Sequence, residues 1–159
     1  MPRHERHNPY QYAFDFSARE TAQSQHVRLV EEPHIIQTPA DAAMYLMDQV
    51  FSPFEQFRQE QLYVLLLDIK QRITHDVMVY KGTVNTVNMR VAELFMEAVR
   101  VNAPSIILSH CHPSGDPTPS PEDVKATQMA CEAGKLLEIN VLDHIIVGKT
   151  KWESLQEKG

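Results

Sequence analysis

Cysteine and long apolar runs are both scarce in this sequence, and their scarcity restricts the class of protein. The two cysteines, Cys111 and Cys131, form no C-x-x-C pair, which gives neither a disulfide framework nor a four-thiolate zinc site. No stretch approaches the ~18 apolar residues of a membrane-spanning helix, and the N-terminus lacks the apolar centre of a signal peptide. We therefore expect a cytoplasmic protein with reduced thiols and no membrane contact.

Positive charge is also in deficit. The chain has 15 Lys and Arg residues against 21 Asp and Glu residues, which gives a formal net charge of -6 at pH 7. This balance creates no global positive field for phosphate backbones or anionic membranes, so nucleic-acid binding is the weaker expectation. With 159 residues, 43% of them hydrophobic, the chain is long enough for one domain with its own core.

The start of the chain differs in pattern from the rest. Residues 1–32 mix charged residues, Gln and Ser without a clear period, except that every second residue from Tyr10 to Phe16 is aromatic. This stretch is interpreted either as a disordered arm or as a short strand or docking segment that packs those aromatics. We expect an arm or tail over 1–34, dispensable for folding over residues 1–32, and one domain over 35–159.

From Thr38 onward the hydrophobic pattern predicts alternating helices and strands. Thr38 can cap a helix whose first position is Pro39. The continuous apolar run 62–67 is typical of a central strand covered on both faces. Further along, the pattern predicts strands over 73–80, 105–109 and 141–147 and helices over 91–99 and 121–137. The order α-β-β-α-β-α-β predicts an α/β sandwich, a mixed β-sheet flanked by helices.

Candidate metal ligands gather after the 105–109 strand. His110 and His112 are two residues apart, so in an extended chain both imidazoles point to the same side and can bind one ion. A stiff, proline-rich loop then turns the chain, and Asp123 can return to the same ion. Two imidazoles and one carboxylate leave a coordination position for water, as catalytic rather than structural zinc sites do.

Each of these residues also has an ordinary structural interpretation. Ser120 is a good helix N-cap with Pro121 at the first helical position, and Asp123 completes a capping box. A His-x-His pair at the edge of a strand is often incidental. The combined spacing His110-x-His112-x7-Ser120-x2-Asp123 is far more specific than any of its parts.

This spacing resembles the metal motif of the JAMM (JAB, MPN-plus) metalloproteases, and the stretch from His112 to Ser120, HPSGDPTPS, resembles their RadC-like branch. The resemblance extends from about Ile35 to Gly159 through the stretches LLLD at 65–68, GTVN at 82–85, EAGKLL at 132–137 and LDHII at 142–146. Longer RadC-like proteins carry an N-terminal helix-hairpin-helix region, for which residues 1–34 are too short. We therefore expect a RadC-like JAMM domain without that region.

The resemblance implies a JAMM/MPN-like, cytidine-deaminase-like sandwich with zinc held by His110, His112 and Asp123. It also implies an upstream glutamate that activates a water molecule, and Glu60, at the start of the central strand, is the position matched to it. Glu55 is the competing choice. The family role of Ser120 is to donate a hydrogen bond to the oxyanion of a tetrahedral intermediate.

Two further residues carry open interpretations. Cys111 stands where the RadC-like pattern usually has Asn, and it should point to the face opposite the two histidines. We expect a small buried residue there, with a redox-sensitive thiol as the alternative. His144 is either a core histidine or a hydrogen-bond partner of a metal ligand.

The function expected from these features is a zinc-dependent metallohydrolase, a metallopeptidase or isopeptidase with a peptide or protein substrate. In this interpretation Glu60 moves the proton of water, and Ser120 stabilises the oxyanion. The alternative is a DNA-associated accessory factor whose metal site is structural or idle. A metal-dependent nuclease is disfavoured, because it would be expected to use a carboxylate-rich magnesium or manganese site. The sequence leaves the oligomeric state open.

Overall fold

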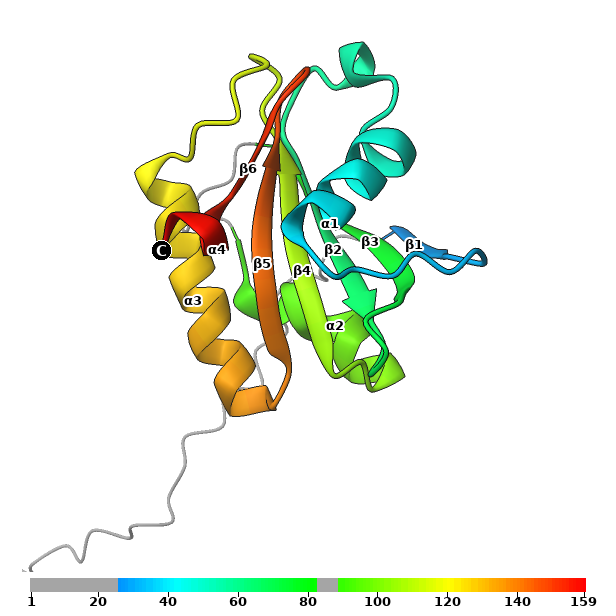
Figure 1. The fold of residues 1–159 in the computed structure, drawn as a ribbon. Coiled ribbons are helices and arrows are strands. Elements are labelled where there is room, and N and C mark those ends of the chain that lie inside the picture. Colours follow the sequence, from blue (N-terminus) through cyan, green and yellow to red (C-terminus); the bar gives the residue numbers. More distant parts are fainter. Residues whose placement is uncertain (1–25, 83–88) are drawn as a thin grey trace, which may run out of the picture.

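The computed structural model describes residues 26–82 and 89–159, which build a six-stranded mixed β-sheet with helices on both faces (Figure 1). The strand order is β1-β3-β2-β4-β5-β6. The expected α/β fold class is confirmed. The aromatic alternation from Tyr10 to Phe16 and most of the GTVN stretch at 82–85 lie outside the described residues.

All seven elements expected from the sequence are present, together with several short ones that were not predicted. The strands are β1 (His26–Leu29), β2 (Gln61–Leu67), β3 (Ile73–Lys81), β4 (Ser105–Cys111), β5 (Asn140–Val147) and β6 (Trp152–Ser154). The helices are α1 (Pro39–Tyr45), the π-helical η1 (Leu46–Val50), the 3-10 helix η2 (Phe54–Gln56), α2 (Val91–Val101), α3 (Pro121–Leu137) and α4 (Leu155–Lys158). In the part of the chain that the structure describes, no helix is both long and apolar enough to cross a membrane.

The connection from β4 to β5 determines where the candidate ligands lie. These two strands are parallel and are joined through α3, whereas β2 pairs with β3 and with β4 in antiparallel register. Parallel strands need such a crossover, and the helix that makes it starts at the edge where the first strand ends. The end of β4 and the start of α3 are therefore brought to the same edge of the sheet (Figure 1).

Strand β2 is buried on both faces, as its continuous apolar run predicted. Leu62, Val64 and Leu66 pack with side chains of α2 and α3 on one face. Leu65 and Leu67 pack with α1 and η1 on the other. The sheet therefore separates two cores. The candidate ligands lie at the end of the face that α2 and α3 cover.

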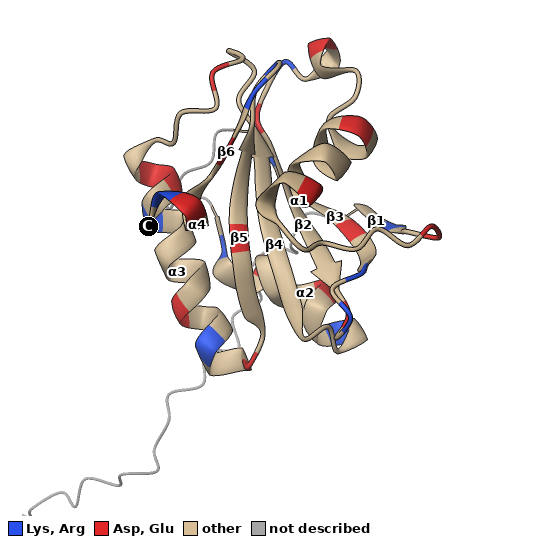
Figure 2. Cartoon of the chain, in the orientation of Figure 1, with Lys and Arg blue, Asp and Glu red and all other residues tan. Residues whose placement is uncertain are grey.

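The capping predictions for α1 and α3 are confirmed. Thr38 and Ser120 each close a capping box, with Asp41 and Asp123 respectively as the third helical residue. Acidic residues in the first turn of α3 and Lys135 in its last turn also match the direction of the helix dipole (Figure 2). The start of α3 is thus fixed by its sequence, which in turn fixes the position of Asp123.

Strand β1 lies within the stretch expected to be an arm. It pairs with the edge of β3, and Arg28 forms an ion pair of 2.6 Å (Nη2 to Oδ2) with the buried Asp76 of that strand. Tyr45 of α1 donates a second hydrogen bond of 2.6 Å to the same carboxylate oxygen. The sheet therefore begins before the boundary expected at residue 35. The rest of the arm prediction, for residues 1–25, concerns positions outside the described ones.

Candidate metal centre

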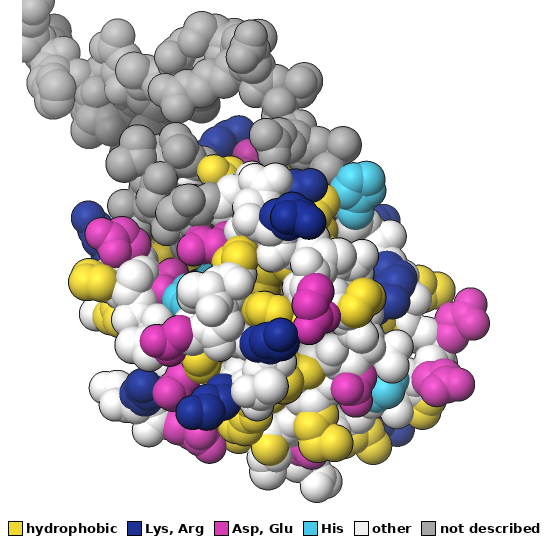
Figure 3. Space-filling view, turned by 90° about the horizontal axis from the view of Figure 1, so that it is seen from above, with side chains coloured by type: hydrophobic (Ala, Val, Ile, Leu, Met, Phe, Trp, Pro, Cys, Tyr) yellow, Lys and Arg dark blue, Asp and Glu magenta, His cyan; other side chains and the backbone are white. Residues whose placement is uncertain are grey.

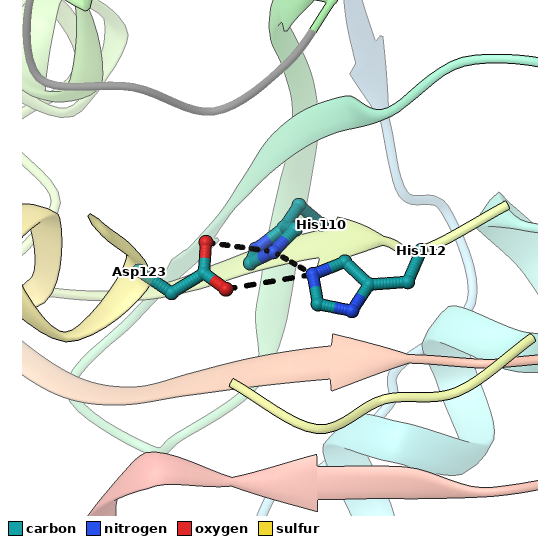
Figure 4. A group of neighbouring side chains, drawn as sticks. All are labelled: His110, His112 and Asp123. Carbon is teal, nitrogen blue, oxygen red and sulfur yellow. Dashed lines mark hydrogen bonds and ion pairs between the residues drawn. The ribbon is translucent and has the colours of Figure 1, made fainter. Parts of the chain in front are cut away.

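The three candidate ligands converge at the edge of the sheet where β4 ends (Figure 4). His110 is the second-to-last residue of β4, His112 follows directly after the strand, and Asp123 lies in the first turn of α3. The side chains of His110 and Asp123 are 0% and 2% exposed, and that of His112 is 14% exposed. The site is therefore nearly closed, and His112 forms its solvent side.

The distances between the ligand atoms suit one small cation. The Nε2 atoms of His110 and His112 are 2.9 Å apart. Asp123 places Oδ1 3.2 Å from Nε2 of His110 and Oδ2 3.4 Å from Nε2 of His112. Ligands about 2.1 Å from a tetrahedral zinc ion are about 3.4 Å from one another. This group can hold a metal ion.

Charge at the site is set mainly by Asp123. Burial opposes ionisation of this carboxyl, but the two neighbouring imidazoles and the hydrogen bond from the Ser120 N–H (2.8 Å) hold its pKa well below its usual range. In turn, the hydrogen bond with Asp123 raises the pKa of His112. At neutral pH the site therefore offers one anionic oxygen ligand beside two imidazoles.

Backbone hydrogen bonds hold the loop between the ligands against the end of β5 and the residues that follow it. The backbone N–H of His112 donates to the carbonyl oxygen of Val147 (2.9 Å). The backbone N–H of Lys149 donates to the carbonyl oxygen of Gly115 (3.2 Å). A Cβ atom on Gly148 would lie 2.2 Å from the carbonyl oxygen of Gly115, so no larger residue fits there. Within the loop, Nδ1 of His112 is 2.9 Å from the carbonyl oxygen of Asp116, which orients the imidazole.

His110 is oriented from the other side, by side chains. Its Nδ1 lies 2.7 Å from Nε2 of His144, a β5 residue that is 1% exposed. Nδ1 of His144 is in turn 2.6 Å from the hydroxyl of Thr127, on α3. Of the two interpretations of His144 left open by the sequence, the structure supports the contact with a ligand. Thr127 was not singled out from the sequence, although it lies one helical turn after Asp123.

The capping role of Asp123 is confirmed, and the same carboxylate also faces the two candidate imidazole ligands. Its Oδ2 accepts from the Ser120 N–H, and its oxygens face the imidazoles. The Ser120 hydroxyl oxygen accepts from the Asp123 N–H at 3.1 Å. Because a hydroxyl that accepts a hydrogen bond still has its own proton, Ser120 can also donate.

Glu60 directly precedes β2, the strand that pairs with the end of β4. Leu62 is directly opposite His110 in the antiparallel pair of β2 and β4, and Glu60 precedes Leu62 by two residues. Continued two residues beyond this pair, the register would bring Glu60 opposite His112, and the negative charge of Glu60 contributes to the raised pKa of His112. By contrast, Glu55 is 67% exposed and forms an ion pair of 3.4 Å with Lys149.

Cys111, between the two histidines, faces the opposite core. It is 0% exposed and packs with the residues beneath α1. Burial raises the pKa of its thiol to about 11, so the protonated form dominates at neutral pH. The expectation of a small buried residue is confirmed, and a protonated, enclosed thiol is a poor redox sensor.

Comparison with known families agrees with this arrangement. A model of the RadC-like JAB domain matches residues 36–159. The chain belongs to the RadC-like JAB domain family. The matched region contains every described helix and the five strands β2 to β6, whereas β1 precedes it.

Curated relatives of this RadC-like JAB domain carry the name UPF0758 protein. The one from Roseiflexus castenholzii is 44% identical over 129 residues, which are 81% of this chain and 54% of the relative. One from Chloroflexus aurantiacus is 45% identical over 130 residues, 82% and 55% of the two chains. One from Clostridium botulinum is 43% identical over 124 residues, 78% and 53% of the two chains. The chain thus spans about half the length of these relatives.

Proposed function

We propose that this RadC-like JAB domain is a zinc-dependent metallohydrolase that cleaves a peptide or isopeptide bond. The observation that carries the proposal is the nearly closed group of His110, His112 and Asp123, with the negative charge of Glu60 acting on His112. Two nitrogen ligands and one carboxylate suit zinc and leave a coordination position for water or substrate. When bound, zinc lowers the pKa of water toward ~7 and polarises a carbonyl group.

The residues around the ligands have separate roles in the proposed reaction. Glu60 takes a proton from the attacking water and returns it to the leaving amine, as a general base and then a general acid. Ser120 donates a hydrogen bond to the oxyanion that develops on the carbonyl oxygen. The hydrogen bond that Ser120 accepts from the Asp123 N–H holds its hydroxyl beside the ligands.

A peptide or protein substrate fits the surface better than DNA does. Figure 3 looks onto the edge of the sheet where β4 and β5 end, and the Lys and Arg side chains on that face are interspersed with acidic and neutral ones. The chain as a whole has a net charge of -6. Proteins that bind phosphate backbones usually gather Lys and Arg on one face.

The test is a cleavage screen with zinc-loaded protein against mixed peptides and isopeptide-linked protein conjugates. Wild type should cleave a member of the panel, chelation should stop cleavage, and Glu60→Gln should slow it strongly. Glu55→Gln is the matched control, because it alters a nearby exposed carboxylate and should retain activity. Cleavage that persists in chelator would refute the proposal. Salt-sensitive DNA binding with no cleavage, and no effect of Glu60→Gln, would favour the accessory-factor alternative.

A further inference from the structure

A chain of hydrogen bonds behind the ligands begins at the Thr127 hydroxyl. Its Oγ1 is 2.7 Å from the backbone carbonyl oxygen of Asp123 and 2.6 Å from Nδ1 of His144. A carbonyl oxygen can only accept, so the single hydroxyl proton of Thr127 is donated to Asp123. The same Oγ1 must then accept from His144, which requires a proton on Nδ1 of that ring.

The proton on Nδ1 determines what the other nitrogen of His144 can do. The ring is 1% exposed, and its other neighbour is a second imidazole, surroundings that favour the neutral form. A neutral imidazole carries one N–H, so Nε2 of His144 is an acceptor. It lies 2.7 Å from Nδ1 of His110, and Nδ1 of His110 must therefore be the donor.

We propose that His144, oriented by Thr127, is a positioning residue that holds the ring proton of His110 on Nδ1 and so keeps Nε2 open to a metal ion. The proposal rests on the metal-binding part of the proposed function and is independent of hydrolysis. His112 reaches the same state differently, because its Nδ1 donates to the backbone carbonyl of Asp116. The tautomer of His112 is thus set by the backbone of the loop, and that of His110 by side chains from α3 and β5.

The first measurement uses wild type without metal. Two-dimensional NMR that correlates the ring nitrogens with the ring carbon-bound protons distinguishes the two neutral tautomers of each histidine. The proposal requires a proton on Nδ1 in both His144 and His110. A proton on Nε2 of His144 would overturn it, whether or not the protein binds zinc or cleaves any substrate.

The second measurement compares Thr127→Val with Thr127→Ser. Valine keeps the shape but removes the acceptor, so the buried Nδ1–H of His144 would have no partner. The proton of His144 should then move to Nε2 and donate to His110, whose own proton moves to Nε2, the metal-binding atom. Zinc affinity, measured by competition with a chromophoric chelator, should fall roughly 10–100-fold, the usual effect of losing such a partner. Serine keeps the hydroxyl and should restore both the tautomer and the affinity.

Strand β3 offers a matched control. Thr74 donates to a backbone carbonyl, that of Leu66 (3.2 Å), and its hydroxyl is 2.9 Å from Nδ1 of His75. This is the same arrangement as Thr127 and His144, but away from the ligands. Thr74→Val should leave the His110 tautomer and the zinc affinity unchanged.

Should Thr127→Val match wild type in both readouts, the positioning role is refuted while the hydrolase proposal stands. Absence of hydrolysis alongside the expected tautomers would instead refute only the hydrolase.

Discussion

The Nε2 atoms of His110 and His112 lie 2.9 Å apart, and in each ring the other nitrogen already has a hydrogen-bond partner. With both rings neutral and protonated on Nδ1, two lone pairs would face each other at this distance and repel. A cation between them removes the repulsion, and Asp123 supplies a compensating negative charge. The pair therefore favours a bound cation: a proton in the metal-free protein, and a metal ion when one is available.

The first prediction concerns metal content. Protein purified without chelator should hold about one zinc ion per chain, because three ligands are already gathered. The double variant His110→Ala/His112→Ala should lose it, as measured by elemental analysis. Cys111→Ala is the control, since this residue lies between the two ligands in sequence but faces the opposite core. Unchanged zinc in the double variant would disprove the ligand assignment.

The second prediction isolates the general base. Glu60→Gln keeps the shape of the side chain but removes the proton acceptor, so hydrolysis should fall roughly 10²–10⁴-fold. Zinc content and melting temperature should stay near wild type, because Glu60 is not expected to be a ligand. Steady-state rates on a peptide found in the screen provide the measurement. Full activity in Glu60→Gln would mean that another residue acts as the base, and Glu55 would be examined first.

The third prediction concerns the double role of Asp123. Asp123→Asn replaces an anionic ligand by a neutral amide, so zinc affinity and activity should both fall. The start of α3 should also lose roughly 0.3–1 kcal/mol, since a negative charge in the first helical turn interacts favourably with the helix dipole. Chelator competition and urea unfolding of the metal-free protein separate the two effects. An Asp123→Asn protein with wild-type zinc affinity would limit the carboxylate to its capping role.

The fourth prediction is a difference in pH dependence between the metal-free and zinc-loaded protein. The hydrogen bond with Asp123 raises the pKa of His112 in the folded protein, despite burial, and the Asp116 carbonyl and the charge of Glu60 act in the same direction. A raised pKa stabilises the fold fully below the unfolded value of about 6.5, and this stabilisation is lost as pH rises through the folded value. Zinc needs the neutral ring, so its own stabilisation increases over the same range.

Above about pH 6.5, therefore, the free energy of unfolding should fall with pH in the metal-free protein and stay nearly level in the zinc-loaded protein, where the growing zinc term offsets the loss. Urea unfolding at a series of pH values would measure both slopes. His112→Asn is the control and should remove the contrast between them. Parallel slopes in wild type would show that the proton and the metal do not compete for His112.

The fifth prediction concerns strand β1. Arg28→Ala removes the cation that pairs with the buried Asp76 and leaves its carboxylate with Tyr45, so stability should fall by roughly 1–3 kcal/mol. Removal of residues 1–25 should cost much less than removal of residues 1–32, because the longer deletion also removes β1. Thermal melts of Arg28→Ala, the two deletion variants and the full chain provide the comparison. Equal melting temperatures for the two deletions would show that β1 contributes little to the fold.

Features that depend on residues close together in the sequence were predictable from it. The spacing of His110, His112 and Asp123 combines strand alternation with a helix cap, both of which are local rules. The two-sided burial of β2 followed from its continuous apolar run. Strand β1 was missed because four residues are too few for a period, and its position depends on the distant contact between Arg28 and Asp76.

Other parts of the site depend on contacts between separate elements. Glu60 directly precedes β2, and in the sequence only the family resemblance connected it with the ligands. The contact between Thr127 and His144 joins α3 to β5, and neither residue follows a pattern that identifies its partner. Such contacts are created when the sheet and its crossover helix assemble, so no local spacing predicts them.

All three candidate ligands come from one continuous stretch, β4, the loop and the start of α3, whereas Glu60 lies just before the neighbouring strand β2. A single codon change at Glu60 would therefore silence the proposed hydrolysis in a descendant and leave its candidate metal site and fold intact. Loss of the metal would require damage to the stretch that also begins α3. Lineages of this domain should accordingly include inactive members that still bind metal, recognisable by an intact His-x-His and Asp pattern behind a non-acidic residue at position 60.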